Sequence, residues 1–269
     1  MKIVIVLLSL VSIFGFSQNS TASKEVQESQ KAIIKEFLND CAQKYDYGIL
    51  MNERQKCLDA GLAKDSTIAY LWQQKAMPLF KMRKYEAGMV FLDKAVLYDE
   101  KSWLDYRAFI KCIFVKSYKD AIVDFEKCKT ILGNSYVMDH SYDFHIALSY
   151  LQLNEFEKAE TIFKKDTEDQ KNRLGEAHHL DLFYYGISLY EQNKYIESIQ
   201  VFNRALKQFP DFSDVKFYKA IAMIRAGQPR ELADILIDEA KKDLENGNTI
   251  NEDQIFYEMY PYQIRKLIN

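Results

Sequence analysis

Apolar residues recur along much of the chain at the spacing of an amphipathic α-helix. The clearest stripe occupies positions i, i+3, i+4, i+7, i+10 and i+11, namely Tyr195, Ser198, Ile199, Phe202, Ala205 and Leu206. Polar residues fill the intervening positions, as expected for a helix that buries one face. This segment is therefore predicted to be a helix that packs along one side.

Four segments share this pattern. Each begins with an aromatic residue, has a small residue three positions later and a bulky residue seven positions later. The leading aromatics are Tyr85, Tyr118, Phe156 and Tyr195, at spacings of 33, 38 and 39 residues. A lone helix pair of this size buries too little apolar surface to offset its ordering entropy. The repeat therefore predicts helix pairs that stack on one another.

The repeat resembles the tetratricopeptide repeat, a unit of about 34 residues made of two helices. The best copy runs over residues 179–212, with Gly186, Ser198, Phe202, Ala205 and Pro210 at the family's positions. Weaker copies contain Ala147, Tyr150, Ala159 and Phe163, then Trp72, Ala76, Leu92 and Ala95, then Ala220 and Gly227. The resemblance implies an all-α, right-handed superhelical solenoid of about five to six helix hairpins over residues 18–245.

The last part of the chain, residues 246–269, differs from the repeats. Gly247 is expected to end a helix, and an apolar segment follows around Pro261. We expect this segment to form a C-terminal capping helix that covers the last exposed seam. The alternative is a detachable docking peptide.

Residues 1–17 have the pattern of a secretory signal peptide. Lys2 precedes an apolar run, and small residues follow at Gly15 and Ser17. An uncleaved anchor is the alternative, but about 14 apolar residues are fewer than the roughly 20 that span a bilayer. We expect cleavage after Ser17, no transmembrane anchor in the mature chain, and a periplasmic or secreted protein. The end of this segment resembles exported proteins of Bacteroidota.

The amino-acid composition excludes further classes of fold and of partner. Only 9 Gly and 4 Pro serve 269 residues, too few turn-forming residues for a protein built of many short strands. The net charge of −3 gives no strong attraction to nucleic acid. We therefore expect neither a nucleic-acid partner nor an all-β fold.

The sequence contains no phosphate-binding loop, no H-E-x-x-H and no C-x-x-C. His140, His145, His178 and His179 are the histidines, and with Asp139 or Asp181 they offer the donor types that bind zinc. Four histidines spread over two connections specify no ligand geometry. We therefore expect solvent-facing or packing roles for them, with no metal, no cofactor and no enzymatic activity.

The cysteines are Cys41, Cys57, Cys112 and Cys128. In the repeat numbering, Cys112 and Cys128 are offset by about 9 Å along the helix axis, beyond the roughly 7 Å that a disulfide spans. Cys41 and Cys57 lie at nearly the same height along the axis of their hairpin, so a disulfide between them is geometrically possible. Because all four replace small apolar residues, we expect buried free thiols.

Tetratricopeptide solenoids bind an extended peptide or a helix along the face lined by their first helices. The resemblance places fourteen side chains there: Tyr70, Gln73, Met77, Phe80, Lys81, Phe144, Leu148, Leu151, Phe183, Ile187, Tyr190, Phe217, Ile221 and Arg225. The family's Lys and Asn clamp for a terminal carboxylate is missing. An open aromatic strip indicates a binding surface, so we expect a non-enzymatic scaffold that binds a partner protein segment. A glycan-binding or glycan-uptake accessory is the alternative function. The alternative for the aromatic strip is that inserts or the tail cover it and make it core.

Overall fold

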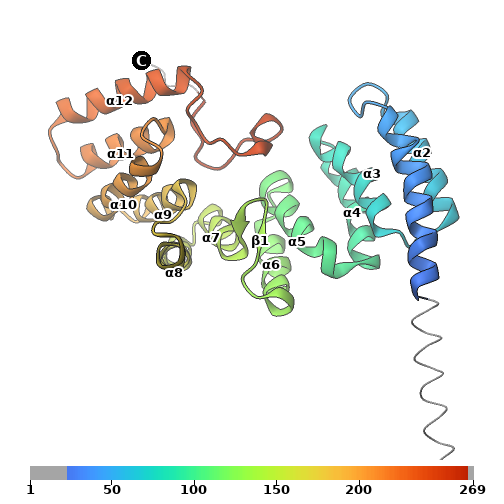
Figure 1. Ribbon diagram of the computed structural model, residues 1–269. Coiled ribbons are helices and arrows are strands. Elements are labelled where there is room, and N and C mark those ends of the chain that lie inside the picture. The colour runs from blue at the N-terminus through green and yellow to red at the C-terminus, as the bar shows by residue number, and fades with distance from the viewer. Residues whose placement is uncertain (1–22, 266–269) are drawn as a thin grey trace, which may run out of the picture. The chain divides into compact units, whose positions relative to one another are not determined.

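The computed structural model describes residues 23–265, which form two compact units, the first ending at Glu100 and the second beginning at Lys101. The predicted signal peptide lies outside the described residues. In the first unit, residues 23–33 are helical and lead into a π-helical stretch, η1 (Ile34–Asn39), and a 3-10 turn, η2 (Ala42–Lys44). The helices α2 (Met51–Lys64), α3 (Ala69–Lys81) and α4 (Tyr85–Tyr98) follow, so that two helix hairpins make up this unit (Figure 1).

The second unit continues the pattern with four hairpins. The first consists of α5 (Glu100–Ile110), its π-helical extension η3 (Lys111–Val115) and α6 (Tyr118–Leu132). The others are α7 (Tyr142–Gln152) with α8 (Phe156–Leu174), α9 (His179–Glu191) with α10 (Tyr195–Gln208), and α11 (Ser213–Arg225) with α12 (Arg230–Glu245). Within this unit, each of α6 to α11 packs against the α-helix that follows it in the chain. The prediction of an all-α fold built of stacked helix hairpins is confirmed.

The four leading aromatics of the repeat each begin a helix: Tyr85 begins α4, Tyr118 begins α6, Phe156 begins α8 and Tyr195 begins α10. The bulky residues seven positions later, Leu92, Phe125, Phe163 and Phe202, are fully buried. The small residues between them are buried as well. The 3.6-residue stripe therefore marks the face that each second helix turns toward its neighbours.

Three of the hairpins share one connection. The middle residue of a three-residue turn, Arg83, Asn154 or Asn193, has a φ near +60°. The residue after it donates a backbone hydrogen bond to a carbonyl five positions earlier, as in Lys194 N–H to Leu189 (3.0 Å). This left-handed turn satisfies the last carbonyls of the first helix and reverses the chain. The two helices of a hairpin therefore run antiparallel.

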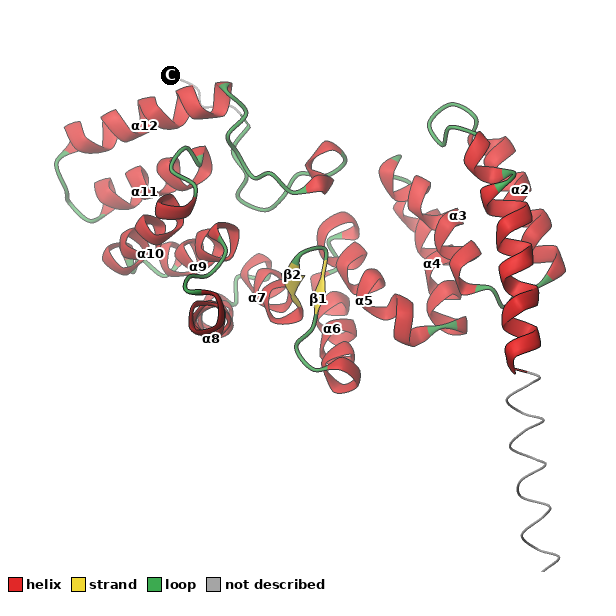
Figure 2. Cartoon of the chain, viewed as in Figure 1, coloured by secondary structure: helices red, strands yellow, loops and turns green. Residues whose placement is uncertain are grey.

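Two parts of the second unit depart from the expected pattern. A two-stranded antiparallel ladder, β1 (Tyr136–Val137) with β2 (His140–Ser141), precedes α7 (Figure 2). The expected C-terminal capping helix is instead an irregular segment that contains one 3-10 turn, η4 (Asp253–Phe256). Pro261 and the left-handed residue Tyr262 (φ 58°) are incompatible with a continuous helix here.

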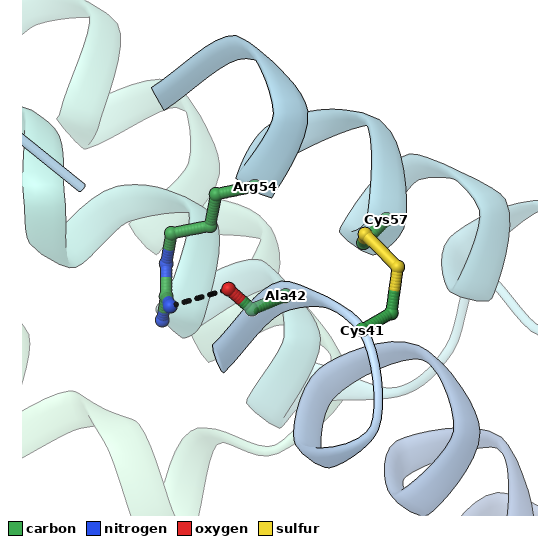
Figure 3. The surroundings of a disulfide bond; sticks show 4 residues. All are labelled: Cys41, Ala42, Arg54 and Cys57. Atoms are coloured by element: carbon green, nitrogen blue, oxygen red, sulfur yellow. Dashed lines mark hydrogen bonds between the residues drawn. A yellow bond between two sulfur atoms is a disulfide. The ribbon is translucent and has the colours of Figure 1, made fainter. Parts of the chain in front are cut away.

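Cys41 and Cys57 form a disulfide, with their Cα atoms 5.9 Å apart (Figure 3). The expectation of four free thiols is therefore wrong for this pair, whose level positions in the hairpin allow the bond. Beside it, the Arg54 guanidinium donates to the Ala42 carbonyl (3.0 Å). Cys112 and Cys128 are buried free thiols, as predicted, and burial raises the pKa of each to about 12.

Candidate functional site

The first-unit residues predicted to bind a partner lie on α3. Tyr70 is 38% exposed, whereas Gln73 and Phe80 are buried. Met77 and Lys81 are partly exposed, and the Lys81 ammonium lies 5.0 Å from the centre of the Tyr47 ring. On this helix the predicted face is therefore open only at some positions.

In the second unit the predicted aromatic strip is largely core. Phe144, Leu148, Leu151, Phe183 and Ile187 have no exposed surface. A partner cannot contact these side chains in this structure, so the expectation of an open aromatic strip is corrected at all five positions. Four residues of the set stay accessible: Tyr190, Phe217 and Ile221 are half-buried and Arg225 is exposed.

Ring contacts explain why the strip is closed. Phe144 stacks on His140 with a centroid distance of 4.0 Å and meets the Tyr184 ring edge-on. Phe183 packs against Phe202 and Phe212 at centroid distances of 6.3 and 5.5 Å. These aromatic residues join successive hairpins, so they hold the stack together.

The C-terminal segment, residues 246–265, lies against the same hairpins (Figure 1). Its strongest anchor is the buried carboxylate of Asp214 in the first turn of α11. The backbone N–H groups of Ile250 and Ile264 donate to its two oxygens (3.2 and 2.7 Å), and the Thr249 hydroxyl donates as well (2.7 Å). Burial raises the pKa of Asp214, while these donors oppose the rise.

Further contacts join the C-terminal segment to earlier helices of the second unit. The Tyr184 hydroxyl donates to the Pro261 carbonyl (3.0 Å). The Tyr262 ring meets that of Tyr218 at 5.8 Å, and the Asn248 carbonyl accepts from the Ser213 N–H (2.9 Å). Glu258 lies 3.3 Å from the ammonium of Lys116, just after η3. These contacts reach the first, third and fourth hairpins of the unit rather than only the last one.

Near the middle of the segment, Glu252 meets a buried histidine. His140 Nδ1 lies 2.9 Å from Asp181 Oδ2, and its Nε2 lies 3.2 Å from Glu252 Oε1. Burial opposes protonation of this ring, but Asp181 and Glu252 outweigh it and raise the pKa of His140 to about 10. The imidazolium in turn holds the pKa of Asp181 below its usual range, against the effect of burial.

Polar side chains of α8 complete this cluster. The Gln170 amide donates to both Asp166 (2.9 Å) and Asp181 (2.6 Å). Its oxygen accepts from the backbone N–H of His178 (3.0 Å). Burial raises the pKa of Asp166 to about 6, and the negative charge of Asp181 adds to the rise. Beside the cluster is a cavity of about 410 Å³, lined by Tyr136, Asp139, Gln170, Leu174, His178, Asn251, Glu252 and Asp253.

The other two histidines serve packing. His145 is buried, which agrees with the packing role expected for it, and it stacks on Phe125 with a centroid distance of 5.1 Å. Burial and the positive charge of His140 lower the pKa of His145 to about 3. His179 lies edge-on to Phe212 at 5.5 Å. His178 is 45% exposed, as expected for a solvent-facing residue at the start of a helix.

The anchors of the C-terminal segment are not among the residues expected from the sequence. Asp214 is a buried acidic residue in the first turn of α11, as Asp143 is in α7 and Asp181 in α9. An acidic residue at the start of an otherwise apolar helix is a signal that could have pointed to Asp214. Tyr184, which holds the Pro261 carbonyl, carries no such signal.

The family model for the tetratricopeptide repeat matches residues 182–211, which lie in α9 and α10. This is the hairpin whose sequence follows the repeat most closely, and the other hairpins follow the same pattern. The chain therefore contains a tetratricopeptide repeat at residues 182–211. No curated protein sequence matches it. Within the described residues, no helix has the length and apolar character needed to cross a membrane.

Solved tetratricopeptide repeat structures share the fold. A tetratricopeptide repeat protein from Parabacteroides merdae ATCC 43184 is 14% identical, with a TM-score of 0.58 over 85% of this chain and 96% of that one. The type IV pilus biogenesis factor PilW is 11% identical, with a TM-score of 0.58 over 76% and 89%. YrrB, described as having an unusual peptide-binding site, is 17% identical, with a TM-score of 0.50 over 74% and 95%. Identities this low establish the fold alone.

Proposed function

We propose that this protein is a non-enzymatic scaffold that binds an extended segment of a partner protein on the first helices of its second unit. One observation carries the proposal: an irregular polypeptide segment, residues 246–265, already occupies these helices. It is held through its backbone, at Asn248, Ile250, Pro261 and Ile264. Backbone recognition of an extended chain, with pockets for some side chains, is a general mode of peptide binding.

The solved structure of YrrB supports this function, because its description names a peptide-binding site on the same type of repeat. Glycan binding, the alternative, relied on stacked aromatics open to solvent. Phe144 and Phe183 have no exposed surface on which a sugar ring could stack. A protein or peptide is therefore the partner that the geometry favours.

A test that needs no identified partner uses the chain's own segment as the probe. A labelled peptide of residues 246–265 is titrated into the full chain and into a Tyr262→Ala variant, which loses the ring contact with Tyr218. The tethered segment competes at an effective concentration on the order of millimolar. We therefore expect saturable binding of the peptide to the variant and weaker binding to the wild type.

Phe256→Ala is the matched control, because Phe256 lies in the same segment but is 84% exposed. This control should bind the peptide as weakly as the wild type. If no form binds the peptide, or if Phe256→Ala and Tyr262→Ala bind it equally, these helices are not a peptide-binding face. Saturable binding of soluble oligosaccharides by a chain that captures no protein would favour the glycan alternative.

We also propose that the protein is exported to the periplasm or beyond. The pattern of residues 1–17 supports export, as does the Cys41–Cys57 disulfide, since such bonds persist in oxidising compartments. Intact-mass measurement of the protein from its native host should give a chain that begins at Gln18. A chain that retains Lys2 would contradict cleavage.

A further inference from the structure

We propose that His140, His178 and Asp181 form a binding site for a divalent transition-metal ion of the zinc type, with a fourth position open to the adjacent cavity. Within residues 23–265, this is the one group of three such side chains whose ligand atoms all lie within 4.8 Å of one another. The inference goes beyond the proposed scaffold function, and it assigns a role to a cluster that peptide binding does not require.

The donor atoms fit zinc in kind and spacing. Asp181 Oδ2 lies 2.9 Å from His140 Nδ1 and 3.5 Å from His178 Nδ1. Around a zinc ion with bonds of about 2.1 Å, tetrahedral ligand atoms are about 3.4 Å apart. Two imidazole nitrogens and one carboxylate oxygen form a donor set of intermediate softness, which suits zinc better than calcium or magnesium.

The surrounding hydrogen bonds are those that orient metal ligands. A metal-binding histidine usually donates its second ring N–H to a carboxylate, and the Nε2 atom of His140 lies 3.2 Å from Glu252. The second oxygen of Asp181 accepts from Gln170 (2.6 Å), and Gln170 also accepts from the backbone N–H of His178 (3.0 Å), which fixes the start of α9. His140 and Asp181 are thus held by partners that remain in place when an ion binds, whereas the half-exposed His178 ring is free to adjust to the ion.

Charge also favours a cation at this point. Asp181 is 1% exposed and Asp166 is 3% exposed, while the Glu252 side chain is 12% exposed. Carboxylates taken out of water are stable only when a positive charge compensates them. Without an ion the His140 ring supplies that charge through its contacts with Asp181 and Glu252. A divalent ion that takes the place of the Nδ1 proton of His140 supplies it in the loaded protein.

An ion can reach the site from the cavity of about 410 Å³. His178 lines this cavity and is half-exposed, and Glu252, Asp139 and Gln170 line it as well. Structural zinc sites are closed by four protein ligands, whereas a site with three protein ligands keeps a position for water or another group. The proposed site therefore has an entry path, and its fourth position faces solvent.

No metal was expected here from the sequence, because the ligands come from distant positions. His140 precedes α7, whereas His178 and Asp181 lie at the start of α9. No short motif joins them. The stacking of the two hairpins, with α8 between, brings the imidazoles and the carboxylate together.

The test measures zinc binding by the full chain, purified without a histidine tag and stripped with a chelator. A competition titration against a chelating dye should give one ion per chain. Substitution of an outer partner lowers metal affinity by about 10- to 100-fold, so Glu252→Gln is expected to weaken binding about 10-fold. His178→Ala removes a direct ligand and should weaken binding by more than about 100-fold.

His179→Gln is the matched control, because it removes the neighbouring imidazole and leaves the three ligands intact. Cobalt, used in place of zinc, should give the visible absorption bands of a low-coordinate site in the wild type and in His179→Gln, but not in His178→Ala. His178 is half-exposed, so this variant is expected to fold, which circular dichroism checks. The absence of saturable zinc binding would overturn the proposal, as would equal binding by the wild type and His178→Ala.

Discussion

Single side chains decide how closely the hairpins pack and how the fold responds to acid. His145 is a clear case, because its ring is fully buried and its Nε2 lies 3.2 Å from the Val137 carbonyl. The lowered pKa of about 3 means that this ring is neutral in the folded state. Unfolding releases it to an ordinary pKa near 6.5, so the unfolded chain binds a proton that the folded chain excludes.

His145→Gln should therefore reduce the sensitivity of the second unit to acid. Because the folded pKa of His145 is depressed, its unfolded form is favoured progressively as the pH falls from 6.5 toward 3. Between pH 6 and pH 4 the wild type should lose about 2 kcal/mol more of its unfolding free energy than the variant loses. Urea denaturation at several pH values measures this difference. Equal losses in the two proteins would show that His145 is not the group responsible.

The pairing of helices depends on positions with no side chain. Gly186 in α9 faces Phe202 in α10, and a Cβ at Gly186 would lie 2.6 Å from Cδ1 of that ring. Gly88 in α4 faces Phe80 in α3 in the same manner, also 2.6 Å from the ring at Cε1. In the α9–α10 hairpin the first helix supplies the glycine, and in the α3–α4 hairpin the first helix supplies the ring. In both, the two helices can pack this closely only because one of the facing positions has no side chain.

Gly186→Ala is expected to destabilise the second unit by about 1–3 kcal/mol, since the Phe202 ring must move within a filled core. Thermal unfolding followed by circular dichroism should show the loss. Gln200→Ala, on the exposed face of α10, is the control and should change stability by no more than about 0.5 kcal/mol. Equal stability of Gly186→Ala and the wild type would mean that the two helices can separate at little cost.

The described part of the molecule consists of two compact units, and each unit has its own hydrophobic core. In the first unit Leu38, Ala42, Leu58 and Leu71 form a fully buried cluster beside the disulfide. In the second, buried residues run through successive hairpins from α5 to the C-terminal segment. The bond between Cys41 and Cys57 thus lies wholly in the first unit.

Removal of the disulfide should affect the unfolding of one unit only. The bond closes a loop with a sequence separation of 16 residues, which stabilises the folded state by about 3 kcal/mol in the chain-entropy description. Cys41→Ala combined with Cys57→Ala should lower the first unit's denaturation midpoint. The second unit serves as the internal control. Hydrogen exchange resolved by peptide can separate the two units, and equal loss of protection in both would contradict their independence.

The contrast between the hairpins and the C-terminal segment shows how far the sequence predicts this molecule. The second-helix starts at Tyr118, Phe156 and Tyr195 were predicted because helical periodicity is local. The course of the C-terminal segment was not, because its contacts join residues far apart in the chain. Asp214 and Ile264 are 50 positions apart, and His140 and Glu252 are 112 apart.

The same limit applies to the candidate site. Repeat positions identified which residues lie on the first helices, yet they carried no information on what covers them. Phe144 and Phe183 therefore look the same in the sequence whether they meet a partner or the chain's own rings. The Cys41–Cys57 disulfide shows the same limit. The repeat positions of the two cysteines allowed the bond, but their apolar surroundings in the sequence favoured free thiols.

The Asp214 carboxylate receives the N–H groups of both Ile250 and Ile264, so one side chain fastens both ends of the stretch between them. That stretch is a closed loop whose two ends meet at one carboxylate. An exchange of a side chain that points to solvent inside it, such as Phe256 (84% exposed), leaves this junction and the contacts with the hairpins in place. The exposed side chains of the loop can therefore vary while the repeats beneath it stay as they are.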